Sequence, residues 1–292
     1  MQTLQLGWQP AAVLSVALAV GAAAAPTLSR RYGATIRPYL RESAFVAALY
    51  ALWQLAGSYS SSNGAGAFSR GRWIVRFEHG WLPGERDLQE LIVHSELASR
   101  AANWFYASMH FTMIGLLLIW LFVRHRDRYP RVRNVLALLT AACLVIQFVP
   151  VAPPRLLPEL GFVDTAARYG ESVYDIKGIT VDQLSAMPSV HVGWALLVAW
   201  AVITVSPSRH RWWILAHPIL TVFVVVATAN HYWLDGIVAG LLLVASIGVV
   251  RLASALLGMD HGDPGRRTFT HRDKGIGGRV ESDPARDELV RP

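Results

Sequence analysis

Long apolar runs separated by short polar connectors dominate the chain. Seven runs approach or reach the roughly 17 to 25 residues that a helix needs to cross a bilayer. They are residues 8–25, 43–58, 101–123, 134–151, 189–205, 212–229 and 232–250. Because hydrocarbon cannot satisfy free backbone N–H and C=O groups, such runs must be helical. The pattern predicts an all-α, polytopic transmembrane helical bundle of six to seven spans, of which the run at 43–58 is the shortest.

The first run has two interpretations. Its alanine-rich end resembles the cleavage region of a signal peptide. A signal peptide carries basic residues before its apolar stretch, whereas here Arg30 and Arg31 follow it. We therefore favour a retained span with its N-terminus outside, and keep cleavage as the alternative.

Composition and charge fit a membrane protein. Of the 292 residues, 53% are hydrophobic and 16% charged, against roughly 25% charged in a soluble domain. The net charge of +7 is unevenly spread. Inside connectors at 30–42, 124–133, 206–211 and Arg251 hold 12 Lys or Arg, and outside segments at 59–100 and 152–188 hold 8 in a longer stretch. The basic excess therefore indicates orientation in a cell membrane. The predicted spans exclude a soluble nucleic-acid binder, so no nucleic acid is expected as a partner.

Four regions follow from this topology. Two N-terminal spans with a cytoplasmic connector occupy residues 1–58, and an amphipathic segment at the outer interface occupies 59–100. A transmembrane core follows at 101–258. The tail at 259–292, with seven basic and seven acidic residues, is predicted to be disordered and cytoplasmic.

Three polar stretches at span ends carry the candidate chemistry, because ionisable groups are expensive in apolar surroundings. They read Pro-Val-Ala-Pro-Pro-Arg at 150–155, Ala-Met-Pro-Ser-Val-His at 186–191 and Asn-His-Tyr-Trp-Leu-Asp at 230–235. An even number of crossings separates the three ends. All three are therefore predicted on the outer side of the membrane.

Side chains in these stretches suit phosphoryl transfer without a metal or cofactor. On a helix, His231 and Asp235 would share one face about 6 Å apart, so the carboxylate could orient the imidazole. His191 lies at a helix start, where backbone N–H groups favour an anion. Arg155 adds a planar fork suited to phosphate. His231 would attack phosphorus, His191 would protonate the leaving oxygen, and water or an alcohol would take the phosphoryl group.

Each feature alone has a structural explanation. His231 and Asp235 could form a hydrogen-bonded pair between helices. Pro188 and Ser189 could simply start and cap a helix, and Arg155 could extend from a span end toward water. Their joint occurrence at three span ends on one side favours a site.

The stretches at 186–191 and 230–235 resemble the second and third signature motifs of the type 2 phosphatidic acid phosphatase superfamily. Together with Ala-Pro-Pro-Arg at 152–155, they are most similar to the branch related to inositol phosphorylceramide synthase, the aureobasidin-resistance type of inositol phosphotransferase. The resemblance covers about residues 103–240. It implies a helical core with a metal-free site near the outer interface.

The resemblance also implies roles for individual residues. His231 would be the nucleophile, His191 the general acid and Asp235 the residue that orients His231, while Ser189 would help to bind phosphate. The phosphatase form of the superfamily carries further cations at two places where this chain has Phe148 and Val225.

Three more residues are candidates for supporting roles. Lys177, in the outer loop, could replace a missing cation or be an ordinary loop charge. His110, deep in the third apolar run, could support the site or hydrogen-bond between helices, and we favour the second reading. Asn230 directly precedes His231 and is expected behind the reacting groups.

The sequence thus predicts an enzyme that acts on a phospholipid or a polyprenyl mono- or diphosphate at the outer leaflet. Its expected partners are this substrate and membrane lipids. A transferase of inositolphosphoryl head groups is one alternative to a phosphatase. A non-catalytic lipid transporter or scaffold is another, and predicts that the two histidines lie beyond about 6 Å, twice the reach of a hydrogen bond.

Overall fold

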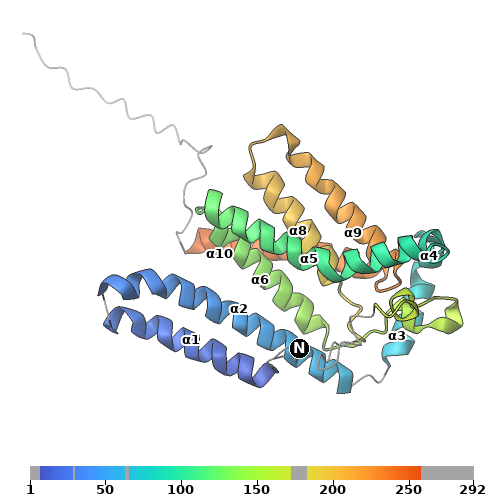
Figure 1. Ribbon diagram of the computed structural model, residues 1–292, viewed down its shortest axis with the longest axis horizontal. Helices are drawn as coiled ribbons and strands as arrows, with labels where there is room; N and C mark the ends of the chain where they lie inside the picture. Colours follow the sequence, from blue (N-terminus) through green and yellow to red (C-terminus); the bar gives the residue numbers. More distant parts are fainter. Residues whose placement is uncertain (1–6, 29, 63–65, 172–182, 258–292) are drawn as a thin grey trace, which may run out of the picture. The chain divides into compact units, whose positions relative to one another are not determined.

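The apolar runs form helices in a computed structural model of the chain, which describes residues 7–28, 30–62, 66–171 and 183–257 (Figure 1). Within these residues every regular element is a helix. The α-helices are α1 (Trp8–Leu28), α2 (Arg30–Ser62), α3 (Ala67–Glu78), α4 (Glu85–Val93), α5 (Glu96–Arg124), α6 (Tyr129–Ile146), α7 (Thr165–Arg168), α8 (Val190–Val205), α9 (Ala216–Ala227) and α10 (Trp233–Leu256). Short 3-10 helices cover Pro154–Leu156, Pro158–Leu160 and Arg209–Leu215. The predicted all-α class is confirmed.

Five helical stretches in the described part are long and apolar enough to cross a membrane. They are Trp8–Thr27, Glu96–Arg124, Tyr129–Ile146, Arg209–Ala227 and Trp233–Leu256. Helix α8 is also apolar but is shorter than these five. The chain is therefore a polytopic helical membrane protein. The predicted span at 43–58 lies within α2, which does not reach the same apolarity, and its crossing stays a prediction.

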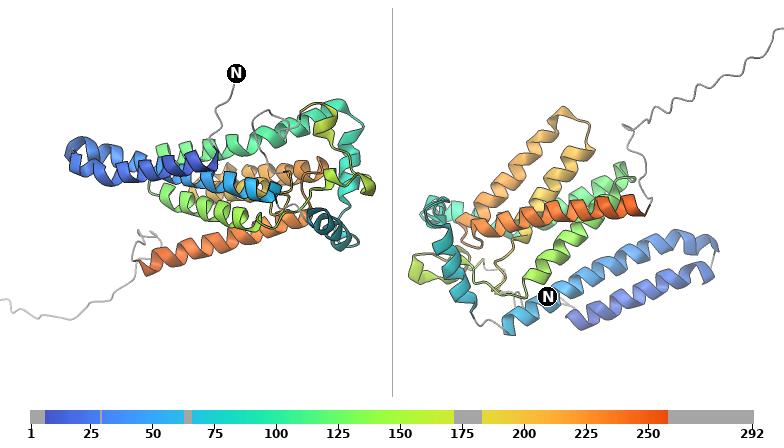
Figure 2. Two further views of the ribbon diagram at one scale, coloured as in Figure 1. Left: turned by 90° about the horizontal axis from the view of Figure 1, so that it is seen from below. Right: turned by 180° about the vertical axis from the view of Figure 1, so that it is seen from behind.

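Helices α1 and α2 run antiparallel as a hairpin (Figures 1 and 2). The basic connector expected at 30–42 is not a loop, because α2 is helical from Arg30 onward. Small residues allow close contact: a Cβ on Gly33 would collide with the carbonyl oxygen of Ala25. The Ser15 hydroxyl donates to the Ala44 carbonyl across the pair at 2.7 Å.

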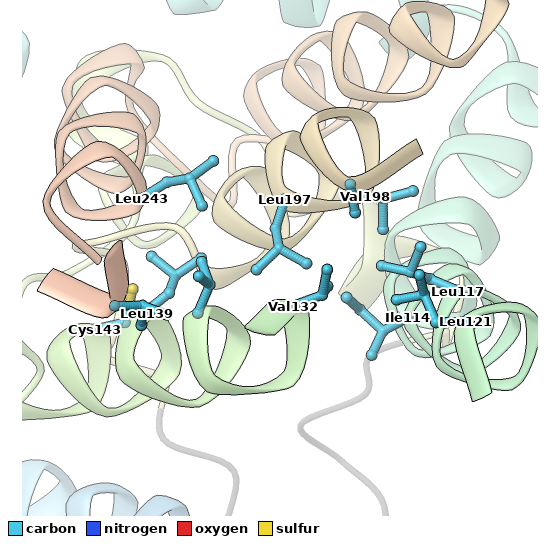
Figure 3. Close-up of a cluster of buried hydrophobic side chains, with 12 residues drawn as sticks. Ile114, Leu117, Leu121, Val132, Leu139, Cys143, Leu197, Val198 and Leu243 are labelled. Atoms are coloured by element: carbon cyan, nitrogen blue, oxygen red, sulfur yellow. The ribbon is translucent and has the colours of Figure 1, made fainter. Parts of the chain in front are cut away.

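The main apolar core joins α5, α6, α8 and α10 (Figure 3). Its fully buried members include Leu121 of α5, Leu139 of α6 and Leu197 of α8. Leu243 of α10 belongs to the same cluster. Close packing of these branched side chains fixes how the helix ends are placed, and thus positions the residues at those ends.

Helices α3 and α4 come from the predicted interfacial segment and pack on the helix ends. Ile74 of α3 is buried with Tyr232, and Ile92 of α4 with Val224 of α9. Other positions of α3 expose aromatic rings, and the exposed Trp73 ring stacks on that of Phe77 one turn later. This segment therefore contributes directly to the surroundings of the candidate site.

Candidate active site

The three polar stretches predicted at span ends meet at one end of the helices. The backbone N–H of Arg155 donates to the carbonyl of Ala229 at 2.8 Å, joining the stretch at 150–155 to the end of α9. Ser189, before α8, donates its backbone N–H to the carbonyl of Asp235 at 3.2 Å. Residues more than thirty positions apart in sequence are thereby held at one place.

Only one ring nitrogen of His231 has hydrogen-bond partners among the described residues. Its Nδ1 lies 2.7 Å from the carbonyl oxygen of Ala186 and 3.2 Å from Oδ2 of Asp235. A carbonyl oxygen only accepts, so Nδ1 carries the proton and Nε2 keeps its lone pair. Nε2 is buried and has no hydrogen-bond partner among the described residues. The ring is thus held in the tautomer that a nucleophile requires.

The contact between His231 and Asp235 has a different origin from the one predicted. Their spacing of four predicted that both residues lie on one face of a helix. Helix α10 begins only at Trp233, so His231 lies in the connection before it. Asp235, in the first turn, reaches back to accept the backbone N–H of Tyr232 at 2.9 Å through the same Oδ2. This reach from the third helical position resembles half of a capping box, and it folds the connection over the carboxylate.

His191, in the first turn of α8, faces the same place. Its ring stacks on Tyr106 of α5, with centroids 4.2 Å apart and planes at 18°. The His191 and His231 ring centroids are 5.6 Å apart. His191 Nε2 is also buried without a hydrogen-bond partner in the described part of the chain. Both imidazoles thus line one cavity, each with a buried nitrogen that has no hydrogen-bond partner among the described residues.

Arg155 is hydrogen-bonded to the residue that directly precedes His231. It is 5% exposed, and its Nε donates to Oδ1 of Asn230 at 2.9 Å. One of its terminal nitrogens donates to Oδ2 of Asp164 at 2.9 Å. The Asn230 amide in turn donates to the hydroxyl of Thr228 at 2.9 Å. Asn230, directly before His231, therefore links the guanidinium to Thr228 at the end of α9.

The remaining predicted residues have distinct surroundings. Ser189 is fully buried, and its hydroxyl accepts the backbone N–H of Val192, which makes it the N-cap of α8. His110 contacts its own helix through the Tyr106 carbonyl at 3.1 Å, with its ring centroid 4.1 Å from that of His191. This hydrogen bond lies within α5, and the role of His110 at the site stays a prediction. Lys177 lies outside the described residues.

A cavity of about 520 Å³ opens at the histidines. His191, His231 and Asn230 line one end of it, and no Lys or Arg lines it among the described residues. In the same part of the chain, no three His, Cys, Asp or Glu side chains are grouped so as to hold a metal ion. The positive charge near this end of the cavity comes from the N-terminus of α8 and from Arg155, which is hydrogen-bonded to Asn230.

Three residues around the site were not predicted. Tyr106 lies in an aromatic run whose buried face has no sequence signature. Asp164, nine residues after Arg155, could have been paired with it by charge alone. Glu78 lies in the amphipathic segment, and only the tertiary structure places it beside Leu234 in α10.

Glu78 holds the start of α10 from outside the membrane helices. It is 1% exposed, and its Oε1 accepts the backbone N–H of Leu234 at 2.5 Å. Burial, a hydrogen bond with Glu85 and the charges of Glu85 and Asp235 raise the pKa of Glu78 to about 9. The Glu78 carboxyl group is therefore protonated at neutral pH.

This protonation predicts a pH-dependent stability. The unfolded chain releases the Glu78 proton near pH 4.5, whereas the folded protein keeps it up to about pH 9. Unfolding therefore releases a proton in this range, and the free energy of unfolding falls as pH rises. In Glu78→Gln the side chain is neutral at every pH, so its melting temperature in detergent should fall less across this range than that of the wild type.

Glu90→Gln is the matched control, because Glu90 is an exposed carboxylate on α4 paired with Arg86. It should reproduce the wild-type pH dependence. Parallel curves for E78Q and the wild type would show that Glu78 is ionised throughout.

Comparison with known proteins adds one relationship. The family model of the PAP2 superfamily matches residues 72–249, more than half of the chain. This match begins in α3 and includes all three polar stretches. No curated protein and no solved structure matches the chain significantly.

Proposed function

Since the chain belongs to the PAP2 superfamily, we propose that it is a membrane phosphatase or phosphotransferase that acts on a lipid phosphate through a phosphohistidine intermediate. Membership of the superfamily supports phosphoryl chemistry in general. The observation that carries the specific proposal is the free Nε2 of His231 beside His191, with 5.6 Å between the ring centroids.

The reaction follows from the geometry of the two imidazoles. The Nε2 lone pair of His231 attacks phosphorus, and the bond between phosphorus and the lipid oxygen breaks. Protonated His191 gives its proton to that oxygen, so the lipid alcohol leaves neutral. Neutral His191 then takes a proton from water or an acceptor alcohol, which attacks phosphorus and releases His231.

Neighbouring groups hold this arrangement and balance its charge. The Ala186 carbonyl fixes the His231 tautomer, and Asp235 balances the positive charge that develops on the phosphorylated ring. Arg155 carries a permanent positive charge and is hydrogen-bonded to Asn230, next to His231. The N-terminus of α8, which Ser189 caps, favours the phosphate anion. Lys177 remains a candidate for a further phosphate contact.

Transfer of a head group to an alcohol is the second candidate outcome. The specific observation in its favour is the absence of two cations expected of the phosphatase form, at Phe148 and Val225. Val225 is buried in an apolar cluster with Val192 and Val226, so no cation fits there without repacking. Together with the motif likeness, this favours the branch related to inositol phosphorylceramide synthase.

A non-catalytic transporter or scaffold is less well supported. It predicts histidines more than about 6 Å apart, and their ring centroids are closer than that. An unreactive protein also has no need of a buried imidazole nitrogen without a protein partner, which is costly to maintain.

We place the site on the outer side and the tail in the cytoplasm. The turns between α5 and α6 and between α8 and the following 3-10 helix lie at the helix ends away from the site. These turns carry basic residues, including Arg126 and Arg209, which the positive-inside rule assigns to the cytoplasm.

The proposed chemistry predicts a characteristic inhibition pattern. Orthovanadate adopts the five-coordinate geometry of phosphorus in the transition state, so it should inhibit phosphate release from phosphatidic acid or a prenyl phosphate by the purified full chain. EDTA should leave the rate unchanged. Adding alcohols such as inositol or glycerol then measures transfer against hydrolysis. Loss of activity with EDTA and recovery with Mg²⁺ would contradict the metal-free mechanism.

A further inference from the structure

The cavity at the histidines extends far into the helices. On α5 its lining runs from Tyr106, beside His191, to Leu118. Those positions are twelve residues apart, which at about 1.5 Å per residue is a depth of about 18 Å. This is more than half of the roughly 30 Å thickness of the hydrocarbon layer. The cavity is therefore a deep channel that starts at the proposed reaction centre.

The lining also points to an apolar occupant. Polar groups such as Gln147, Ser185 and Asn230 lie near the histidines, and the deeper lining is aliphatic and aromatic, including Ile114 and Leu136. No Asp, Glu, Lys or Arg lines the channel in the part of the chain that the structure describes. A molecule with one charged end and one apolar chain matches this distribution.

One wall of the channel comes from outside the family match. Helix α2 contributes Val46, Leu49, Tyr50 and Trp53, whose spacing of three and four places them on one helix face. The match to the PAP2 superfamily begins only at residue 72. This wall is therefore a feature of this chain in addition to the part that carries the phosphoryl chemistry.

Contacts with α6 fix α2 along the channel. Arg133 of α6 pairs with Glu42, and its guanidinium lies 5.7 Å from the centre of the Phe45 ring. Further along, the Tyr59 ring meets Phe148 edge-on, with centroids 5.1 Å apart. Helix α2 is thus held both before and after the stretch that lines the channel.

The same face leaves an entrance. Val46 is 63% and Trp53 40% exposed, and Phe111 of α5, which also lines the channel, is 56% exposed. In a bilayer these side chains face lipid. A chain can therefore enter sideways from the membrane while its charged head stays at the histidines.

We propose that this channel binds an apolar chain of a lipid phosphate, and that α2 determines which chain length is accepted. The inference rests on the proposed function and names the helix that selects the chain of its substrate.

Leu49→Trp tests the proposal by narrowing the channel. Turnover is compared for butyl, dodecyl and hexadecyl phosphate. The variant should lose about tenfold in kcat/KM on hexadecyl phosphate, since a single methylene in an apolar pocket changes selectivity by about 10- to 200-fold. It should keep the wild-type rate on butyl phosphate, whose chain ends near the histidines.

Ala48→Trp is the matched control, because Ala48 is exposed on the same helix and does not line the channel. It should behave as the wild type. Trp53→Ala enlarges the channel and should move the optimum to longer chains, so that an unchanged optimum overturns the proposal even if L49W fails to fold.

These experiments distinguish failure of the proposed function from failure of the chain channel. If no phosphate ester is turned over, the proposed function fails. If butyl and hexadecyl phosphate are both turned over and neither α2 variant changes their ratio, the chain channel is wrong and the phosphoryl chemistry stands.

Discussion

Replacing His231 with Asn should abolish turnover of lipid phosphates, with a loss of at least about 10⁴-fold in kcat. The substitution removes the Nε2 lone pair that is proposed to attack phosphorus. The shorter Asn amide keeps a donor for the Ala186 carbonyl, which accepts from His231 Nδ1 at 2.7 Å. The melting temperature should therefore change much less than the activity.

His210→Asn is the control for this substitution. His210 is exposed in the 3-10 helix before α9, away from the site. This variant should retain the wild-type rate of phosphate release and of transfer to added alcohols. Equal activity of H231N and the wild type would remove His231 from the mechanism.

Asp235→Asn should lower kcat by about 10²- to 10³-fold, less than the loss expected at His231. The Ala186 carbonyl still holds the Nδ1–H tautomer in the variant, so the ring keeps its orientation. What disappears is the negative charge that balances the phosphorylated imidazole. Since the loss falls on the reacting state, KM should change little.

Stability separates this effect from simple damage to the fold. Asp235 is fully buried, and its Oδ1 has no hydrogen-bond partner in the described residues, so a neutral amide costs less to bury than the carboxylate. D235N should melt at or above the wild-type temperature. A variant with full activity, or one inactive only because it unfolds, would contradict the proposed role.

The sequence was a good guide to the helices, because length and apolarity alone are sufficient to place a membrane span. It was less informative where tertiary contacts decide. The connector expected at 30–42 is helical because α2 packs along α1, with Gly33 against Ala25. The interfacial segment supplies α3 and α4, which fold onto the ends of α9 and α10.

The same distinction holds at the site. Motif spacing identified His191, His231 and Asp235, and these side chains do lie together. His231 and Asp235 do not share a helix face, as their spacing predicts, because α10 begins only at Trp233. The Asp235 carboxylate instead reaches back to His231. Tyr106 and Glu78 could not be predicted, since stacking and helix capping across distant segments leave no local pattern.

Identification of the phosphorylated residue tests the central claim most directly. The purified wild-type chain is mixed with a lipid phosphate, quenched in alkali within the first turnover, digested and analysed by mass spectrometry. The account predicts phosphate on the peptide that contains His231, stable in base and labile in acid, and absent from H231N. An active enzyme that carries no phosphate on His231, or carries it on another residue, would contradict the account.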